Sequence, residues 1–328
     1  MFFLLIILTI NPILMPPRFT LGISFMGSNQ LAAALFLTLF TLQPGVIFAE
    51  AASTTASSPK SEPVNDSSEK TILDQEVVDH RKVENHPGLI NLYRPNYVLP
   101  YYYTGRPYQT IYIDNTPNNQ PLKHEELKAQ LSLLVPLIHH LWKDKPLSLD
   151  FAYTQLMYWQ VYAKSQYFRE TNYEPELFVE NYFNSHFAGQ IGVNHQSNGR
   201  GGYLERSWNR GYMQAKFSDN QWLATIRGWF LFAEQKSSTL HNPDIAYYLG
   251  YENVLFSYKL GQAKASLELQ NLESGLRRGF IQATLSYPIL KSVSIYTQFF
   301  TGYGQSLIEY NHKTTSAGIG IALNDWIT

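Results

Sequence analysis

From about residue 92 onward, apolar and polar residues alternate one by one along most of the chain. In 281–287, for example, Ile281, Ala283 and Leu285 alternate with Gln282 and Thr284. Successive side chains of a β-strand point to opposite faces, so each such segment has one apolar and one polar face. The same alternation is clear in 127–135, 263–270 and 293–299. The pattern predicts β-sheet for this part of the chain.

Turn-forming residues divide this part into about twelve expected strands. They lie near 92–103, 124–138, 147–163, 172–184, 188–197, 207–218, 221–232, 244–260, 263–274, 278–288, 292–303 and 313–326. Some connections are tight, such as 218–220 and 261–262, whereas 104–123, 198–206 and 233–243 are longer. An even strand number with short inner turns and longer outer loops is typical of bacterial outer-membrane barrels. We therefore expect an all-β fold, a twelve-stranded antiparallel transmembrane β-barrel over 89–328.

Composition separates this barrel from a soluble β-sandwich, which would also alternate. The chain has 23 Tyr, 19 Phe and 6 Trp but only 16% charged residues, as expected for apolar faces that contact lipid. Lys216, Arg227, Lys264 and Glu268 lie opposite the aliphatic residues, so we expect them in a polar lumen too narrow for a wide pore. A net charge of −1 without basic runs gives no indication of nucleic acid as a partner, and the lack of cysteine excludes disulfides and thiolate metal sites.

The first 88 residues have a different composition from the rest. Two apolar runs, 1–13 and 31–42, are each too short to span a bilayer, and small residues follow the second run. We interpret 1–49 as a signal peptide that is cleaved after Ala49 or Ala51. Arg18 is the only basic residue before the second run, so Met26 is a candidate start. Residues 50–88 contain a stretch rich in Ser, Thr, Pro and charged residues, and we expect a flexible periplasmic segment there.

The strand expected over 188–197 ends in residues capable of nucleophilic catalysis. Ile191, Val193, His195 and Ser197 share one face, and the next strand places Asn209 on its own apolar side. A serine hydroxyl needs a base to take its proton, and the base needs a third group to orient it. With both chain ends in the periplasm, these residues lie on the lipid-facing surface near the outer leaflet.

Two interpretations of these residues are open from spacing alone. His-x-Ser is a common sequence, and His195 as an interfacial residue next to a turn at Ser197 would need no further explanation. Polar residues on a lipid face are costly, however, and tend to mark function. In the functional interpretation, Ser197 is the nucleophile, His195 the base and Asn209 the orienting amide, with the backbone N–H of Gly199 at the oxyanion.

The chain resembles the outer-membrane phospholipase A family in 195–200, which reads HQSNGR, and in 206–210, which reads RSWNR. Supporting similarity lies in 168–175, 129–133, 285–288 and 302–304, and it extends over about 90–328. The resemblance implies a dimeric, calcium-dependent barrel of the Gram-negative outer membrane, a carboxylic ester hydrolase that acts on phospholipids and lysophospholipids. It gives the same roles to Ser197, His195 and Asn209.

The resemblance also implies roles for positions outside the triad. Gln155 matches a glutamine in the dimer interface, although it could also be an ordinary interfacial residue. Ser165 matches a serine whose carbonyl binds Ca²⁺ in the partner subunit, and Arg200 would offer its carbonyl. The family pattern has Asp two residues after this arginine and Ser five residues after it, where this chain has Gly202 and Glu205. Glu205 could replace the lost oxygen ligand, or it could be a solvated loop charge.

Two other classes of protein compete with the hydrolase. A porin or channel with a degenerate site would conduct ions and release no lysophospholipid. A structural barrel or adhesin would need larger outer loops than those expected here. A histidine, a serine and an asparagine on one lipid-facing surface favour the hydrolase over both.

Overall fold

The computed structural model describes residues 3–8, 21–26, 70–84, 90–138, 141–142, 147–232 and 241–324. The chain forms two units, Met1–Asp66 and Ser67–Thr328. In the first unit, β1 (Phe3–Leu8) pairs with β2 (Leu21–Met26) in antiparallel fashion. The rest of the predicted signal peptide, with its cleavage region, lies outside the described residues, as does most of the predicted segment 50–88.

The second unit contains twelve long strands, the number predicted. They are β4 (Asn96–Thr104), β5 (Glu125–Ile138), β6 (Leu147–Trp159), β7 (Phe168–Asn184), β8 (Phe187–Ser197), β9 (Ser207–Ser218), β10 (Trp222–Leu231), β11 (Glu252–Leu260), β12 (Ala263–Gln270), β13 (Phe280–Leu290), β14 (Val293–Tyr303) and β15 (Lys313–Asn324). A two-residue strand, β3 (Asn91–Leu92), pairs beside β5.

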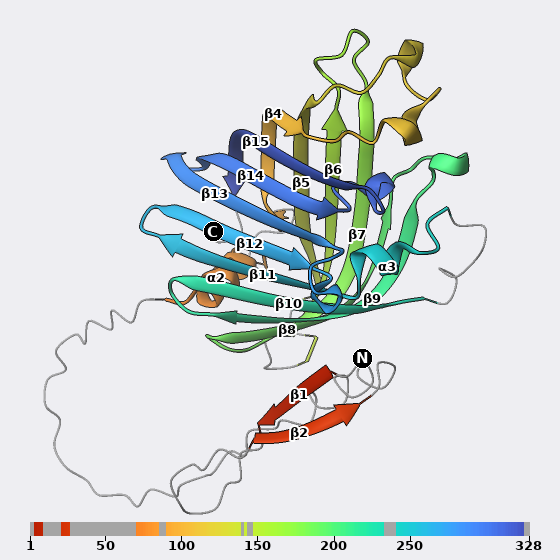
Figure 1. Cartoon of the computed structure of the whole chain (residues 1–328). Helices are drawn as coiled ribbons and strands as arrows, with labels where there is room; N and C mark the ends of the chain where they lie inside the picture. The colour runs from red at the N-terminus through yellow and green to blue at the C-terminus, as the bar shows by residue number, and fades with distance from the viewer. Residues whose placement is uncertain are drawn as a thin grey trace, which may run out of the picture. The chain divides into compact units, whose positions relative to one another are not determined.

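Each of these strands pairs antiparallel with its neighbour in sequence, and the sheet closes on itself. Closure occurs between the last strand and the first, where Ala317 of β15 pairs with Tyr103 of β4. Figure 1 shows the strands from β4 round to β15. The predicted closed, twelve-stranded antiparallel barrel is therefore confirmed.

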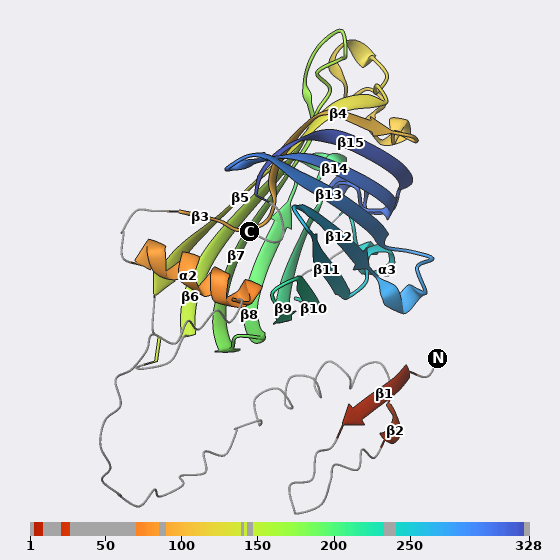
Figure 2. The same cartoon turned by 90° about the vertical axis from the view of Figure 1, so that its left-hand side faces the viewer.

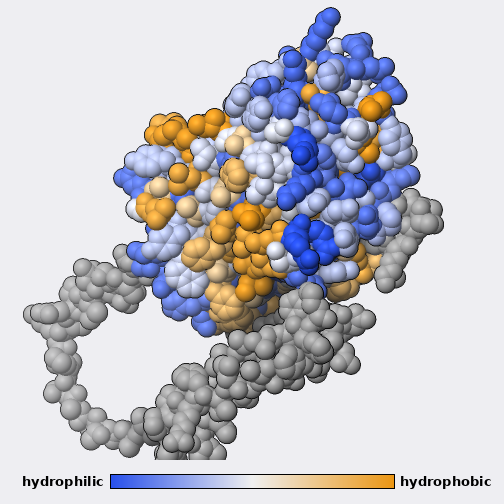
Figure 3. All heavy atoms as spheres, viewed as in Figure 1, coloured by the Kyte–Doolittle hydropathy of each residue, from blue (hydrophilic) through white to orange (hydrophobic). Residues whose placement is uncertain are grey.

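In the barrel, the apolar residues of the alternating pattern face outward and the polar residues face the interior. Large apolar side chains on the outer parity are exposed, for example Val193, Phe256, Leu285 and Ile319. Hydrophobic residues gather over the strands at the front of the molecule, and hydrophilic ones gather over the loops at the upper right (Figure 3). An apolar outer band of this kind is what a barrel in a bilayer requires.

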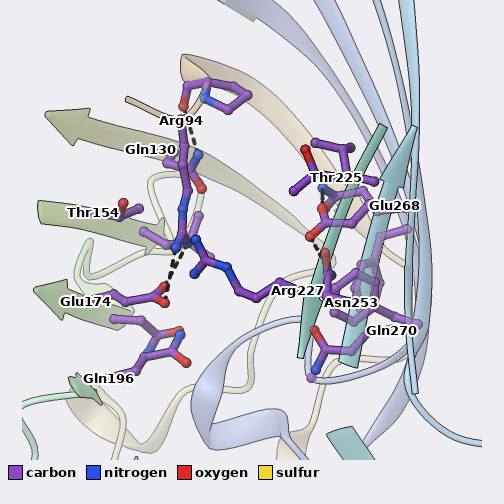
Figure 4. Close-up of a pocket in the computed structure, with 18 of the residues that line it drawn as sticks. Arg94, Gln130, Thr154, Glu174, Gln196, Thr225, Arg227, Asn253, Glu268 and Gln270 are labelled. Atoms are coloured by element: carbon purple, nitrogen blue, oxygen red, sulfur yellow. Dashed lines mark hydrogen bonds and ion pairs between the residues drawn. The ribbon is translucent and has the colours of Figure 1, made fainter. Parts of the chain in front are cut away.

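Charged side chains pair across the interior of the barrel. Arg94 contacts Glu174 at 2.9 Å (Figure 4). Arg94 also contacts Glu176 at 2.7 Å, and Arg227 contacts Glu176 at 3.3 Å. Lys216 pairs with Glu180. These contacts leave a polar cavity of about 270 Å³, which Lys216, Arg227 and Glu268 help to line. The interior is thus largely filled, as the sequence predicted for these three residues.

Short helices lie between and before the strands. They are α2 (Ile72–Glu84), η1 (Gln109–Tyr112), η2 (Pro117–Asn119), η3 (Gly202–Leu204), α3 (Ile245–Leu249), η5 (Leu272–Ser274) and η6 (Leu307–Glu309). Within the described ranges, no helix combines the length and the apolar character needed to cross a membrane.

Two of these helices differ from what the sequence predicted. The expectation of a flexible segment does not hold for α2, because Ile72 and Leu73 are buried and Ile72 N–H donates to Asp219 O at the β9–β10 turn. Figure 2 shows α2 across the end of the barrel. The strand expected from residue 244 begins only at Glu252, because α3 and Gly250, with φ of 68°, come first.

Candidate active site

The outer ends of β8 and β9 lie side by side, and their register sets the site. His195 is directly opposite Asn209, and Ser197 is directly opposite Ser207. Asn198 N–H donates to Arg206 O at 3.1 Å, so this opposite pair occupies a hydrogen-bonded position of the ladder. Hydrogen-bonded and non-hydrogen-bonded pairs alternate along an antiparallel ladder. His195 and Asn209 therefore form a non-hydrogen-bonded pair, the type whose side chains lie closer together.

The side chains of His195 and Asn209 meet at this position. His195 Nδ1 lies 2.7 Å from Asn209 Oδ1. An amide oxygen can only accept a hydrogen bond, so the proton is on Nδ1 of the neutral ring. This tautomer leaves Nε2 with a free lone pair, which is the form that a general base needs. The structure thus brings together the predicted base and its predicted orienting group.

Ser197 follows His195 on the same outward face. Asn194 and Asn198 are each only 4% exposed, whereas Val193, on the parity of His195, is 47% exposed. Two residues of strand rise separate Ser197 from His195 by about 7 Å along the backbone, within reach of the two side chains. Its neighbours across the sheet are Ser207 on β9 and Tyr173 on β7. All three predicted triad positions therefore lie on one lipid-facing patch.

Gly199 lies in the outer loop 198–206, two residues after Ser197. It has φ of 63°, in the left-handed region, and a Cβ atom on it would lie 2.9 Å from Cε2 of Tyr173. Glycine alone fits this conformation without strain and without displacing the Tyr173 ring. The backbone at Gly199 thus runs close to the patch that contains Ser197.

Arg200 and Glu205, the predicted calcium ligands, lie in the same loop. The Arg200 side chain forms an ion pair, in which Nε lies 3.2 Å from Glu170 Oε2. The N–H of Glu205 donates to Gly202 O at 3.0 Å and closes the turn of η3. The half-buried Glu205 carboxylate has no hydrogen-bond or ion-pair partner among the residues that the structure describes.

These donors fit a hard cation better than a softer metal. Within the described part of the chain, no three His, Cys, Asp or Glu side chains cluster closely enough to hold a metal ion. A site in this loop would therefore use backbone carbonyls together with the free carboxylate of Glu205. Carbonyl and carboxylate oxygens are the ligands that Ca²⁺ prefers.

Gln155 lies on β6, and Ser165 lies in the outer loop that follows β6. Ser165 O accepts from Gln120 Nε2 at 2.7 Å, and Ser165 Oγ accepts from Asn118 Nδ2 at 2.8 Å. Its described partners are thus in the 105–124 loop. Gln155 Oε1 accepts from Tyr153 Oη at 3.0 Å, whereas its amide N–H groups have no acceptor among the described residues.

Comparison with known proteins shows the family of this barrel. The family model for phospholipase A1 matches residues 73–323. The chain belongs to the phospholipase A1 family. The Klebsiella pneumoniae phospholipase A1 is 38% identical over 250 residues, which cover 74% of this chain and 84% of that protein. The Escherichia coli K12 phospholipase A1 is 40% identical over 212 residues, 62% of this chain and 71% of that protein.

Solved structures of the family have the same fold. The Salmonella typhi outer-membrane phospholipase dimer with bound calcium has a TM-score of 0.66 and 36% identity, over 73% of this chain and 94% of that one. An asparagine-to-alanine active-site mutant of Escherichia coli outer-membrane phospholipase A has a TM-score of 0.68 and 34% identity, over 76% and 97%. The predicted family is confirmed, and the protein is an outer-membrane barrel of a Gram-negative cell.

Asn198 has a structural role that the sequence reasoning missed. Its Nδ2 donates to Leu204 O at 2.8 Å, and its Oδ1 accepts from Arg206 N–H at 3.0 Å. These bonds fold the 198–206 loop back on itself. Asparagine before glycine is a common turn signal, because its side chain can replace backbone hydrogen bonds. The pair Asn198-Gly199 could have identified this role.

Proposed function

We propose that this family member is a calcium-dependent carboxylic ester hydrolase that cleaves acyl esters of phospholipids and lysophospholipids in the outer leaflet. One observation carries the proposal: His195 Nδ1–H donates to Asn209 Oδ1 at 2.7 Å, on the lipid-facing surface that also contains Ser197. The catalytic groups would thus meet a substrate that remains in the membrane.

The reaction follows from the free Nε2 of His195. Nε2 takes the proton of Ser197 Oγ while Oγ attacks the carbonyl carbon of the ester. The tetrahedral intermediate collapses to an acyl ester on Ser197, and His195 gives its proton to the leaving alkoxide of the lysolipid. Water then attacks the acyl-enzyme, with His195 again as base, and a fatty acid leaves. Asn209 holds the ring and its tautomer throughout.

Negative charge develops on the ester oxygen, and the loop after Ser197 can stabilise it. The backbone N–H of Gly199 would donate to this oxyanion. Calcium bound in the loop would supply positive charge nearby. Its proposed ligands are the Arg200 carbonyl, the Glu205 carboxylate and the carbonyl of Ser165 of the partner subunit. The free carboxylate of Glu205 supports this assignment.

We further propose that two copies of the barrel associate through the face that contains Gln155. Its amide N–H groups lack an acceptor among the described residues, and an unpaired amide in hydrocarbon is unfavourable. A second copy would supply the acceptor and would bring Ser165 to the calcium loop. The homodimer would then be the active form.

A channel function receives no support from the interior of the barrel. Arg94 bridges Glu174 and Glu176, and Arg227 pairs with Glu176 from the opposite direction. These contacts lie in the lumen beside the cavity of about 270 Å³ and narrow it. We therefore do not favour the porin alternative.

Replacement of Ser197 by alanine tests the proposed function. The refolded Ser197→Ala variant should release no fatty acid from phospholipid in mixed micelles with calcium. Ser207→Ala is the matched control, because Ser207 lies directly opposite on the same surface. It should keep most of the parent activity. Full calcium-dependent hydrolysis by Ser197→Ala would overturn the proposal.

A further inference from the structure

The inner face of β8 and β9 carries a cluster of buried and half-buried side chains directly behind His195 and Asn209. Trp208 Nε1 donates to Gln196 Oε1 at 2.6 Å, and Arg210 Nε donates to Asn194 Oδ1 at 2.9 Å. We call Gln196, Trp208, Asn194 and Arg210 the inner cluster. In the strand register, Gln196 faces Trp208 and Asn194 faces Arg210. The two pairs therefore flank the His195–Asn209 pair, one on each side.

The two inner pairs are also joined to each other and to the barrel wall. The Arg210 guanidinium lies 4.1 Å from the centre of the Trp208 ring. Arg210 Nη2 contacts Glu174 on β7 at 2.8 Å, and Asn194 Nδ2 donates to the same carboxylate. In Figure 4, Gln196 and Glu174 project into the interior from the same side of the barrel. The cluster thus links three consecutive strands.

The outer face offers no comparable support for the catalytic pair. Among the described residues, Asn209 is the one hydrogen-bond partner of the His195 imidazole. Lipid tails cannot donate or accept hydrogen bonds, so they cannot orient the imidazole. Cross-strand side-chain contacts stabilise the local geometry of a strand pair. The backbone ladder pairs β8 with β9, and the side-chain contacts on the inner face are what add to it at these residues.

From this arrangement we infer that the inner cluster positions the catalytic pair from within the barrel. The inference rests on the proposed function. Gln196 and Trp208 touch neither substrate nor reacting atoms, so they are positioning residues. Their hydrogen bond fixes the spacing of β8 and β9 at the residues between His195 and Ser197, and between Asn209 and Ser207. Its loss would leave the fold in place and loosen the catalytic geometry.

Two substitutions at Gln196 separate the hydrogen bond from side-chain volume. Gln196→Met keeps a similar size but removes the acceptor for Trp208 Nε1, whereas Gln196→Glu keeps an acceptor oxygen. We expect Gln196→Met to lower kcat by about tenfold to a hundredfold with KM unchanged, because small misplacements of catalytic groups have effects of this size. Gln196→Glu should keep most of the kcat of the parent protein. Trp208→Phe removes the same hydrogen bond from the other strand and replaces Gln196→Met if that variant does not refold.

The control comes from the same two strands. Gln214 Nε2 donates to Gln190 Oε1 at 2.8 Å, also on the inner face but farther from the site. Gln190→Met should leave kcat unchanged. An equal loss of kcat in Gln190→Met and Gln196→Met would mean that any inner pair merely stabilises the barrel, and would overturn the inference.

A double-mutant cycle with Asn209→Ala gives the sharpest test. If the inner cluster acts through the His195–Asn209 contact, then Gln196→Met should change kcat little once Asn209 is alanine. A full multiplicative loss in the double variant would contradict this coupling. Failure of the positioning role can be distinguished from failure of the proposed function. Activity in Ser197→Ala would reject the triad, whereas an unimpaired Gln196→Met with an inactive Ser197→Ala would reject only the positioning role.

Discussion

The contact between His195 and Asn209 joins two neutral side chains on a surface that faces lipid. A carboxylate in the place of Asn209 would orient the imidazole as well, but its charge would be costly to bury near hydrocarbon. The amide keeps the acceptor oxygen and avoids that cost. It also gives less stabilisation to the imidazolium that forms when His195 takes the proton. We therefore expect Asn209 to act mainly through the orientation and tautomer of His195.

This limited role predicts a moderate effect of Asn209→Ala. We expect kcat to fall by about two orders of magnitude, less than the roughly 10⁴-fold loss seen when an orienting carboxylate is replaced. Steady-state hydrolysis of a soluble ester will measure it. Asn253→Ala, in the barrel interior on β11, should have little effect and serves as the control. A loss as complete as that of Ser197→Ala would assign Asn209 a larger role.

Glu205 is the second residue whose chemistry can be tested alone. Glu205→Gln keeps the size of the side chain and removes its charge, so we expect about a tenfold weaker calcium affinity. Calorimetric titration of the refolded protein with calcium gives this value independently of hydrolysis. Glu273→Gln, in another outer loop, should bind calcium like the parent. Equal affinity in Glu205→Gln would remove Glu205 from the ligand set.

Helix α2 shows how an element can depend on its surroundings. Thr71 and Asp74 form a reciprocal cap, in which Thr71 N–H donates to Asp74 Oδ2 at 3.1 Å and Asp74 N–H donates to Thr71 Oγ1 at 3.1 Å. Thr71 Oγ1 also donates to Ser185 O at the β7–β8 turn, and Glu76 pairs with Lys216 of the barrel at 2.9 Å. The helix is thus anchored at its start by the inner end of the barrel.

The cap predicts that docking of α2 depends on pH. Burial raises the pKa of Asp74, but hydrogen bonds from Ser185 and Thr71 outweigh this effect and hold the pKa below its ordinary value. A lowered pKa stabilises the folded form above about pH 4, the ordinary value for Asp. This stabilisation disappears as the pH falls through the lower folded pKa. Hydrogen-exchange protection of α2, corrected for intrinsic rates, should therefore fall in acid.

Two variants of α2 isolate the cap from the rest of the helix. Asp74→Asn should have weaker protection near neutral pH and should lose most of the acid dependence. Asp79→Asn, one turn further along the same helix, should keep that dependence. If Asp74→Asn retained the acid response of the parent, the pH dependence would come from another group.

At the scale of the whole molecule, the barrel could be predicted from the sequence, whereas helix α2 and the inner cluster could not. Alternation such as that of 281–287 defines strands because each one has a lipid face and an interior face. The sequence of α2 is mostly polar, and only the barrel end gives Ile72 and Leu73 a place to be buried. The shared outward face of His195, Ser197 and Asn209 followed from parity, and the structure places all three there. The inner cluster depends on cross-strand register, which parity alone does not give.

Assembly of the barrel is also a property of the whole molecule. Gln155→Leu removes the amide that we expect to pair across the dimer, so it should raise the dimer dissociation constant by about fivefold, or about 1 kcal/mol. Sedimentation equilibrium in detergent with calcium and a bound lipid analogue will measure it. Thr297→Val, outward on β14, should dimerise like the parent. An unchanged dissociation constant for Gln155→Leu would exclude this residue from the interface.

The central claim is that Ser197 is an activated nucleophile on the lipid face. Fluorophosphonate labelling followed by peptide mass spectrometry tests it most directly, in the parent protein with and without calcium. We predict a single labelled peptide modified at Ser197, faster labelling with calcium, and a much slower reaction in Asn209→Ala. Labelling at another serine, or hydrolysis that continues while Ser197 stays unmodified, would contradict the account.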